Sequence, residues 1–160
     1  MALHKLLVEQ FHDESYALIA IHCNLEDYRL AFLLNKHLNI KLKRCLKDLD
    51  FEYTMASYSI YEWKDENQQM TWNLVENICR KEEDALTSTG SLFQSPTKVI
   101  KTFNLIPELN KVDFFLKIDN DGNQIYEKSI IEKIHNIPQI ATVYSVDSEE
   151  LKSRDNLILN

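Results

Sequence analysis

The chain has 160 residues, of which 44% are hydrophobic and 27% charged, and its formal net charge is −7. This length predicts one domain with a sizeable buried core, and the composition excludes an intrinsically disordered or membrane-embedded protein. The acidic balance argues against a protein whose whole surface binds nucleic acid, but it leaves room for a local basic patch.

Targeting and redox features predict a cytoplasmic protein. No apolar run approaches the roughly 20 residues that a membrane span needs. Residues 1–10 have too short an apolar stretch for a signal peptide. Cys23, Cys45 and Cys79 are odd in number and widely spaced, which argues against a disulfide framework or a structural zinc site and favours buried, reduced thiols. We therefore expect no metal, no cofactor and no membrane contact.

The first part of the chain predicts a strand followed by a helix. Leu3–Phe11 is ambiguous between a strand and a helical turn, whereas Tyr16–Cys23 is a nearly continuous apolar run, typical of a buried strand. Asn24 is suited to be the N-cap of a helix over Leu25–Leu38, in which leucines recur at helical spacing. Asn39 is suited to end that helix in a left-handed conformation.

The middle of the chain favours strands and one loop. Ile40–Leu46 is basic and partly alternating, which predicts an edge strand. Phe51–Trp63 and Met70–Cys79 are rich in aromatic and branched residues, and Lys64–Gln69 between them is polar. We therefore expect a long hairpin with a bulge or strong twist in its first strand. Residues 80–104 predict a long mobile loop.

The C-terminal part predicts a strand–helix–strand unit. Val112–Ile118 alternates between apolar and polar residues, with Phe115 as the exception, as a half-buried strand does. Ile125–His135 predicts a helix and Ile140–Val146 a strand, so the two strands should run parallel without necessarily being neighbours. The fold class that we expect is α+β: a single domain with a mixed, mostly antiparallel sheet, about two packed helices and a C-terminal βαβ-like unit.

The common catalytic and metal-binding motifs are missing from the sequence. With only Gly90 and Gly122, the chain has no glycine-rich phosphate loop, no Gly-x-Ser-x-Gly nucleophile elbow and no His-Glu-x-x-His zinc motif. The segment 119–123 superficially suggests a calcium loop, but its glycine stands at the wrong position and Ile130 occupies the place of the required glutamate. It predicts a plain turn.

One block of the sequence resembles a known family. Ile106-Pro107-Glu108, three variable residues and then Val112-Asp113-Phe114 are similar to the signature of the bacterial IPExxxVDY family. That family usually ends the motif in Tyr, so Phe114 departs from it by lacking a hydroxyl group. The resemblance implies family membership and no mechanism, because the family has no established activity and therefore no functional residues to carry over.

Three residues are candidates for catalysis although the common catalytic motifs are missing: Glu108, Asp113 and Cys23. Glu108 and Asp113 could act as a general acid–base pair only if their side chains converged beside a cleft, and their odd spacing places them on opposite faces of a continuous strand. We expect Glu108 to cap backbone groups at the Pro107 bend and Asp113 to face solvent or form an ion pair. Cys23 follows His22 just before a predicted helix, whose N-terminus could activate the thiol. A buried structural thiol is the interpretation that we favour.

The segment Lys36–Lys47 is basic and contains no acid, and its cationic residues are Lys36, Lys41, Lys43, Arg44 and Lys47. With Tyr58, Tyr61 and Trp63 on a neighbouring strand, it would provide stacking surfaces and phosphate contacts, as single-stranded RNA binding requires. The interpretation that we favour is that the lysines protect an edge strand from aggregation and that the aromatic residues belong to the core.

The sequence leaves three hypotheses of function. We favour a non-catalytic protein-binding or adaptor module, because catalytic motifs are missing while a long loop and an edge strand are present. The first alternative is an RNA-associated factor that uses Lys41, Lys43, Arg44 and Lys47. The second is a small enzyme that uses Glu108 or Asp113. Binding that weakens steeply with salt would distinguish RNA from a protein partner, because phosphate contacts release counterions.

Overall fold

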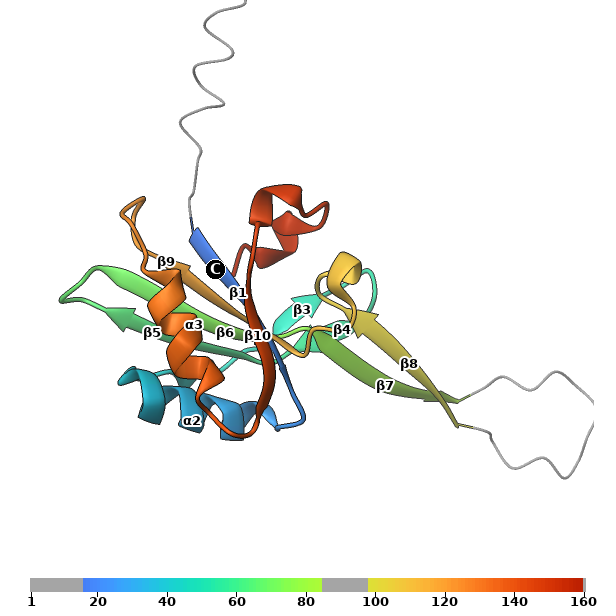
Figure 1. Cartoon of the computed structure of the whole chain (residues 1–160). Helices are drawn as coiled ribbons and strands as arrows, with labels where there is room; N and C mark the ends of the chain where they lie inside the picture. The colour runs from blue at the N-terminus through green and yellow to red at the C-terminus, as the bar shows by residue number, and fades with distance from the viewer. Residues whose placement is uncertain (1–15, 85–97, 160) are drawn as a thin grey trace, which may run out of the picture.

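A computed structural model describes residues 16–84 and 98–159 of the chain. Its main element is a six-stranded antiparallel sheet with the strand order β10-β1-β9-β6-β5-β2 (Figure 1). Two helices of the described chain, α2 (Asp27–Leu38) and α3 (Glu127–His135), cover one face of this sheet. The strands are β1 (Tyr16–Cys23), β2 (Lys43–Arg44), β5 (Ile60–Asp65), β6 (Met70–Glu76), β9 (Phe114–Asp119) and β10 (Ile140–Val146).

Two further strand pairs lie outside the main sheet. β3 (Leu49–Phe51) pairs with β4 (Ala56–Tyr58), and this small sheet contributes to the face opposite the helices. β7 (Ile78–Asp84) pairs with β8 (Lys98–Asn104) in a ribbon that projects from the body (Figure 1). Short 3-10 helices are η2 (Pro107–Leu109), η3 (Ser148–Glu150) and η4 (Arg154–Leu157).

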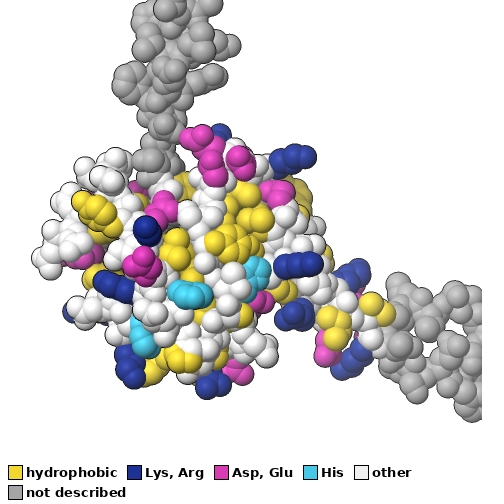
Figure 2. Space-filling model, in the orientation of Figure 1, with side chains coloured by type: hydrophobic (Ala, Val, Ile, Leu, Met, Phe, Trp, Pro, Cys, Tyr) yellow, Lys and Arg dark blue, Asp and Glu magenta, His cyan; other side chains and the backbone are white. Residues whose placement is uncertain are grey.

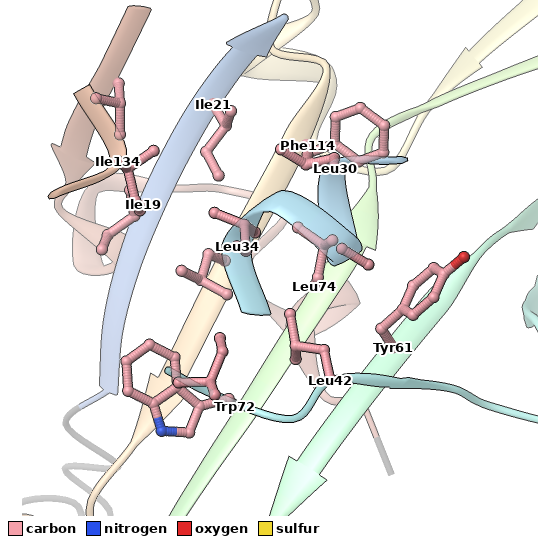
Figure 3. Packing of buried hydrophobic residues seen from close by; sticks show 14 of the residues in the cluster. Ile19, Ile21, Leu30, Leu34, Leu42, Tyr61, Trp72, Leu74, Phe114 and Ile134 are labelled. Atoms are coloured by element: carbon pink, nitrogen blue, oxygen red, sulfur yellow. The ribbon is translucent and has the colours of Figure 1, made fainter. Parts of the chain in front are cut away.

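Separate hydrophobic clusters fill the two faces of the sheet. On the helix side, Leu30 and Leu34 of α2 and Ile134 of α3 pack onto Ile19 and Ile21 of β1 (Figure 3). On the opposite side, alternate residues of the same strands meet the small sheet and the C-terminal segment: Leu18, Ala20, Ala56, Tyr58, Phe115, Leu151, Leu157 and Leu159. Because successive strand residues point to opposite faces, a strand between two cores is apolar at nearly every position, as β1 is.

The C-terminal unit has the predicted arrangement. β9 and β10 each pair antiparallel with β1, which lies between them, so they run parallel to each other without being neighbours. The chain passes from one to the other through α3, which makes a split βαβ unit. Together with the mostly antiparallel sheet and the two packed helices, this confirms the α+β fold class.

β9 is shorter and more buried than predicted. It covers Phe114–Asp119, and both of its faces are apolar. Phe115, which breaks the alternation in the sequence, is completely buried in the cluster opposite the helices. The strand predicted over Val112–Ile118 is therefore present, but it begins at Phe114. It is not half-buried as predicted, because the small sheet and the C-terminal segment cover its second face.

The predicted ends of α2 are correct at one end only. It ends at Leu38, and its C-cap is Asn39, whose φ of 54° and ψ of 45° are left-handed, as expected. Its N-terminus is at Asp27 and its N-cap position is Glu26, so Asn24 is not the cap. The main-chain oxygen of Glu26 accepts the N–H groups of Arg29 and Leu30 at 3.1 and 3.0 Å, which starts the helix there.

The long hairpin expected from Phe51–Trp63 is interrupted. Met55 has a φ of 57°, and the resulting tight turn pairs β3 with β4 in the small sheet. Ser59 separates β4 from β5, so the chain crosses there from the small sheet into the main sheet. β5 and β6 do form a hairpin, with its turn at residues 66–69. The expected bulge is therefore a change of sheet.

The two ends of the expected loop over residues 80–104 form paired strands. β7 and β8 account for residues 80–84 and 98–104, so the loop prediction was wrong there. Both faces of this ribbon are largely exposed, which is why its residues lack the apolar alternation of a half-buried strand. Residues 85–97, and the ambiguous segment Leu3–Phe11, lie outside the described residues.

Candidate functional site

The signature segment is organised around one buried side chain, Asn77. This residue has no exposed surface and lies between β6 and β7. Its Nδ2 donates to the main-chain oxygens of Leu109 and Val112 at 2.9 and 2.8 Å, and its Oδ1 accepts the N–H of Ile106 at 2.8 Å. Its own N–H donates to the main-chain oxygen of Asp113 at 2.9 Å. Asn77 therefore fixes the backbone of the signature at several points.

Both acids of the signature cap backbone groups. Asp113 Oδ2 accepts the N–H of Cys23 at 3.0 Å, at the end of β1. The prediction that Asp113 faces solvent or forms an ion pair was wrong. The carboxylate of Glu108 accepts the N–H and the hydroxyl of Ser153 at 3.1 and 2.6 Å, which lowers the pKa of Glu108. Glu108 caps backbone as expected, but in the C-terminal segment and not at the Pro107 bend.

These caps place the two acids on different segments. Glu108 is directed to the segment before η4, and Asp113 is directed to the end of β1. Three apolar signature residues, Ile106, Val112 and Phe114, belong to the core, because each is at most 3% exposed, whereas Pro107 is exposed. The signature thus supplies packing and backbone caps, and the geometry does not bring its acids together for acid–base chemistry.

His22 and Cys23 point away from each other. Cys23 is buried in the helix-side cluster, and this burial raises the pKa of its thiol, the opposite of nucleophilic activation. His22 lies on the other face, where its Nε2 is 3.0 Å from the hydroxyl of Tyr144 and the two rings stack with centroids 5.5 Å apart. The structure therefore agrees with a structural role for the thiol.

The predicted RNA-binding residues lie together at one edge of the main sheet. Lys43 and Arg44 form β2, the short edge strand, with Lys41 before it and Lys47 after it. All four residues are exposed. The basic segment therefore forms an edge, as predicted, although its strand has only two residues where seven were expected.

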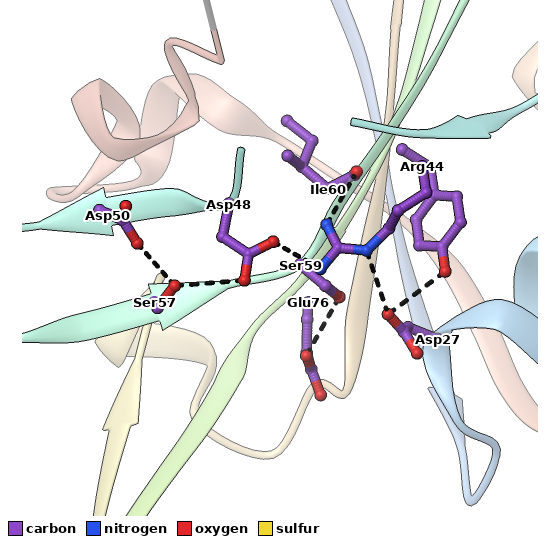
Figure 4. A network of polar contacts seen from close by, with 9 residues as sticks. Asp27, Arg44, Asp48, Asp50, Ser57, Ser59, Ile60 and Glu76 are labelled. Carbon is purple, nitrogen blue, oxygen red and sulfur yellow. Dashed lines mark hydrogen bonds and ion pairs between the residues drawn. The ribbon is translucent and has the colours of Figure 1, made fainter. Parts of the chain in front are cut away.

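Arg44, the arginine of this edge, forms ion pairs with two acidic side chains. Arg44 forms an ion pair with Asp48 at 2.5 Å and lies 3.9 Å from Asp27 (Figure 4). Its guanidinium carbon is 5.7 Å from the ring centroid of Tyr61, whose hydroxyl donates to Asp27 at 3.3 Å. Burial, together with the nearby charge of Asp27, raises the pKa of Tyr61 to about 12. A phosphate at Arg44 would have to compete with both carboxylates.

The three aromatic residues expected beside the basic strand do not form one stacking surface. Tyr61 is buried beneath Arg44, and Trp63 packs against Trp72 with ring centroids 6.4 Å apart. Tyr58 is 2% exposed and belongs to the cluster on the opposite face of the sheet. The expectation that these residues share a strand next to the lysines is therefore correct for Tyr61 and Trp63 and wrong for Tyr58.

Both strands of the β7–β8 ribbon are largely exposed. Val99 and Ile100 on β8 are 44% and 62% exposed. The ion pairs Lys98–Glu82, at 3.3 Å, and Lys101–Glu83, at 2.5 Å, link its two strands. Figure 2 shows hydrophobic, acidic and basic side chains interspersed where the ribbon leaves the body.

A depression of the described surface lies away from the predicted site residues. A depression of about 620 Å³ at the start of α3 is wide open to solvent and is lined by residues 124–129 and Glu132. None of the predicted site residues lines it. In residues 16–84 and 98–159, no group of three or more His, Cys, Asp or Glu side chains is placed to hold a metal ion. No helix in this part of the chain combines the length and apolarity needed to cross a bilayer.

Comparison with protein-family models, curated proteins and solved structures gives no match for this chain. Membership of the IPExxxVDY family therefore stays a prediction from the signature. Sequence reasoning missed Asn77, which carries no signal in the sequence besides its polarity within an apolar segment. It also missed Val99 and Ile100, whose signal was a β-branched pair between Lys98 and Lys101.

Proposed function

We propose that this protein is a non-catalytic protein-binding module and that the β7–β8 ribbon is its contact element. One observation carries the proposal: the ribbon leaves the body of the molecule and exposes Val99 and Ile100. A two-stranded ribbon is marginally stable in water on its own. Burial of these side chains against a partner would contribute about 25 cal/mol per Å² of apolar surface.

The charges of the ribbon indicate what kind of partner it suits. In the register, Val99 lies opposite Glu83, and Ile100 lies opposite Glu82. Each of these acids is paired with a lysine of β8, so both faces carry one apolar side chain beside a compensated ion pair. Such a surface fits a protein partner with an apolar contact region and a polar rim. Binding should change little with salt, in contrast to RNA binding through the β2 edge.

The experiment is an affinity capture of the tagged full chain from its native cytoplasm, with and without RNase, analysed by mass spectrometry. The test variant is V99T/I100T, which keeps β-branched residues in β8 but removes apolar surface. The matched control is I158T, because Ile158 is an equally exposed isoleucine (59%) outside the ribbon. We expect wild type and I158T to capture the same protein after RNase treatment, and V99T/I100T to lose it.

Two outcomes would contradict the proposal. Capture of the same partner by V99T/I100T at the wild-type level would remove the ribbon from the interface. Captured proteins that all disappear with RNase would favour RNA binding, which the variant K41E/K43E/R44E should then abolish. Thermal unfolding of V99T/I100T should match wild type, because both side chains are exposed, so that a lost partner reports on binding and not on folding.

A further inference from the structure

The two edges of the main sheet are protected very differently. The β2 edge has two residues, both basic, and Arg44 is surrounded by ion pairs. The β10 edge has seven residues, Ile-Ala-Thr-Val-Tyr-Ser-Val, with no charge, no proline and no glycine. Natural sheets blunt exposed edges with short strands, lysine, proline or bulges, and a long uncharged edge is a template for pairing with another strand.

The hydrogen-bond pattern shows which backbone groups of β10 face outward. The main-chain oxygen of Ile21 accepts the N–H of Asp113, so Ile21 directs its backbone groups toward the β9 side. Its neighbours Ala20 and His22 therefore direct theirs toward β10, where they lie opposite Tyr144 and Thr142. By the same alternation, Val143 and Ser145 direct their N–H and C=O groups away from the sheet.

No other element of the described chain satisfies these outward groups. Apart from strand pairing, no backbone hydrogen bond in residues 16–84 and 98–159 involves residues 141–146. The β10 edge also holds a positioned aromatic side chain at its centre, because Tyr144 is stacked on His22 and is 37% exposed. Tyrosine is among the residues enriched at protein interfaces.

We propose that β10 pairs antiparallel with β10 of a second copy, about a two-fold axis at Tyr144, so that two sheets become one continuous sheet. In this register Val143 of each copy lies opposite Ser145 of the other, and each such pair exchanges both N–H···O bonds. Every outward backbone group of Val143 and Ser145 is then satisfied. Neither of these hydrogen-bonded pairs involves Ala141, which lies at the irregularity where the β1–β10 register shifts.

The charges around β10 favour a second copy as the occupant. The two-fold axis at Tyr144 places Asp147 of one copy opposite Ala141 of the other, and Glu149 opposite Gln139. Neither acid therefore faces an acid of the other copy. The helix beside this edge, α3, has a balanced set of two acids and two lysines: Glu127, Lys128, Glu132 and Lys133. A symmetric pairing needs a self-complementary edge, and an uncharged strand provides one.

The experiment measures the oligomeric state of the full chain by sedimentation velocity over a wide concentration range. The test variant is S145P, because proline removes the outward N–H and is tolerated at an edge position. Its control is S145A, which keeps the N–H and loses only the side-chain contact with Glu127. A second test variant, Y144K, places two ammonium groups opposite each other, and Q68K on the distant β5–β6 turn controls for the added charge.

We expect wild type, S145A and Q68K to form dimers, and S145P and Y144K to dimerise roughly tenfold more weakly or worse, with circular dichroism like that of wild type. In hydrogen exchange, the amides of Val143 and Ser145 should become protected as the concentration rises. Added salt should strengthen the dimer, because each copy carries a net charge of −7. Wild type that stays monomeric at all concentrations, or S145P that dimerises like S145A, would overturn the proposal.

Discussion

A fully buried amide such as that of Asn77 is tolerated in a protein core only when its donors and its acceptor are bonded. Asn77 meets this condition with three bonds to main-chain groups of residues 106, 109 and 112. These bonds join the base of the ribbon to the turn that leads into β9. The bonded main-chain groups are 29 to 35 residues away from Asn77 in the sequence. This set of bonds favours a single conformation of that turn.

We expect N77A to lower the free energy of unfolding by about 3 kcal/mol, because it leaves the buried carbonyl of Val112 and the buried N–H of Ile106 without partners. The carbonyl of Leu109 keeps its bond from the N–H of Val112. The measurement is chemical denaturation of both proteins. N67A, on the exposed β5–β6 turn, is the control and should cost less than about 0.5 kcal/mol. A cost for N77A no larger than that of N67A would show that the bonds are not needed.

Glu108 gives the fold a measurable dependence on pH. Its hydrogen bonds from Ser153 lower its pKa in the folded protein, so its contribution is present above the unfolded pKa and is lost as the pH falls through the folded pKa. We expect E108Q to reduce the free energy of unfolding near neutral pH, by less than about 1 kcal/mol because the site is exposed, and to have no effect in strong acid. Denaturation across the acid range measures this, and E149Q, at another exposed glutamate, is the matched control.

At the scale of elements, the sequence predicted best where an element is buried. The bounds of β1 and β10 and the end of α3 match the structure, because apolar runs and a helix stop are local signals. β3, β4 and the ribbon were missed. Their pairing depends on the left-handed turn at Met55 and on exposed faces, neither of which produces a hydrophobic period.

The candidate site shows the same division between local and distant signals. The basic edge at Lys43 and Arg44 was predicted as an edge, because lysine clusters there are a local feature. The ion pair between Arg44 and Asp27 was not predicted, because Asp27 lies in the first turn of α2, far from Arg44 in the sequence. The caps made by Glu108 and Asp113 join segments 45 and 90 residues apart, a separation that no spacing rule covers.

At the scale of the whole molecule, each face of the sheet buries one tyrosine with a raised pKa. Burial is the main cause at both Tyr58 and Tyr61, and it raises each pKa to about 12. In the unfolded chain a tyrosine ionises near a pKa of about 10. A pKa raised by folding contributes stability that is complete below the unfolded value and is lost as the pH rises through the folded value.

We therefore expect the free energy of unfolding to fall between about pH 10 and pH 12. The fall should be smaller in Y58F and Y61F and smallest in the double variant. Denaturation at stepped pH, followed by tyrosinate absorbance, measures both quantities. Y126F, which replaces a tyrosine that is 73% exposed, is the matched control. If the free energy of unfolding of the double variant fell as much as that of wild type, groups other than Tyr58 and Tyr61 would cause the fall.

The position of β1 between β9 and β10 has a consequence for protein synthesis. β1 is translated first of the three, but its neighbours begin at Phe114 and end at Val146. During synthesis, β1 therefore remains without its two partner strands until β9 and then β10 have been translated. The sheet can be completed only after β9 and β10 have been synthesised, and until then the apolar surface of β1 is open to non-native contacts.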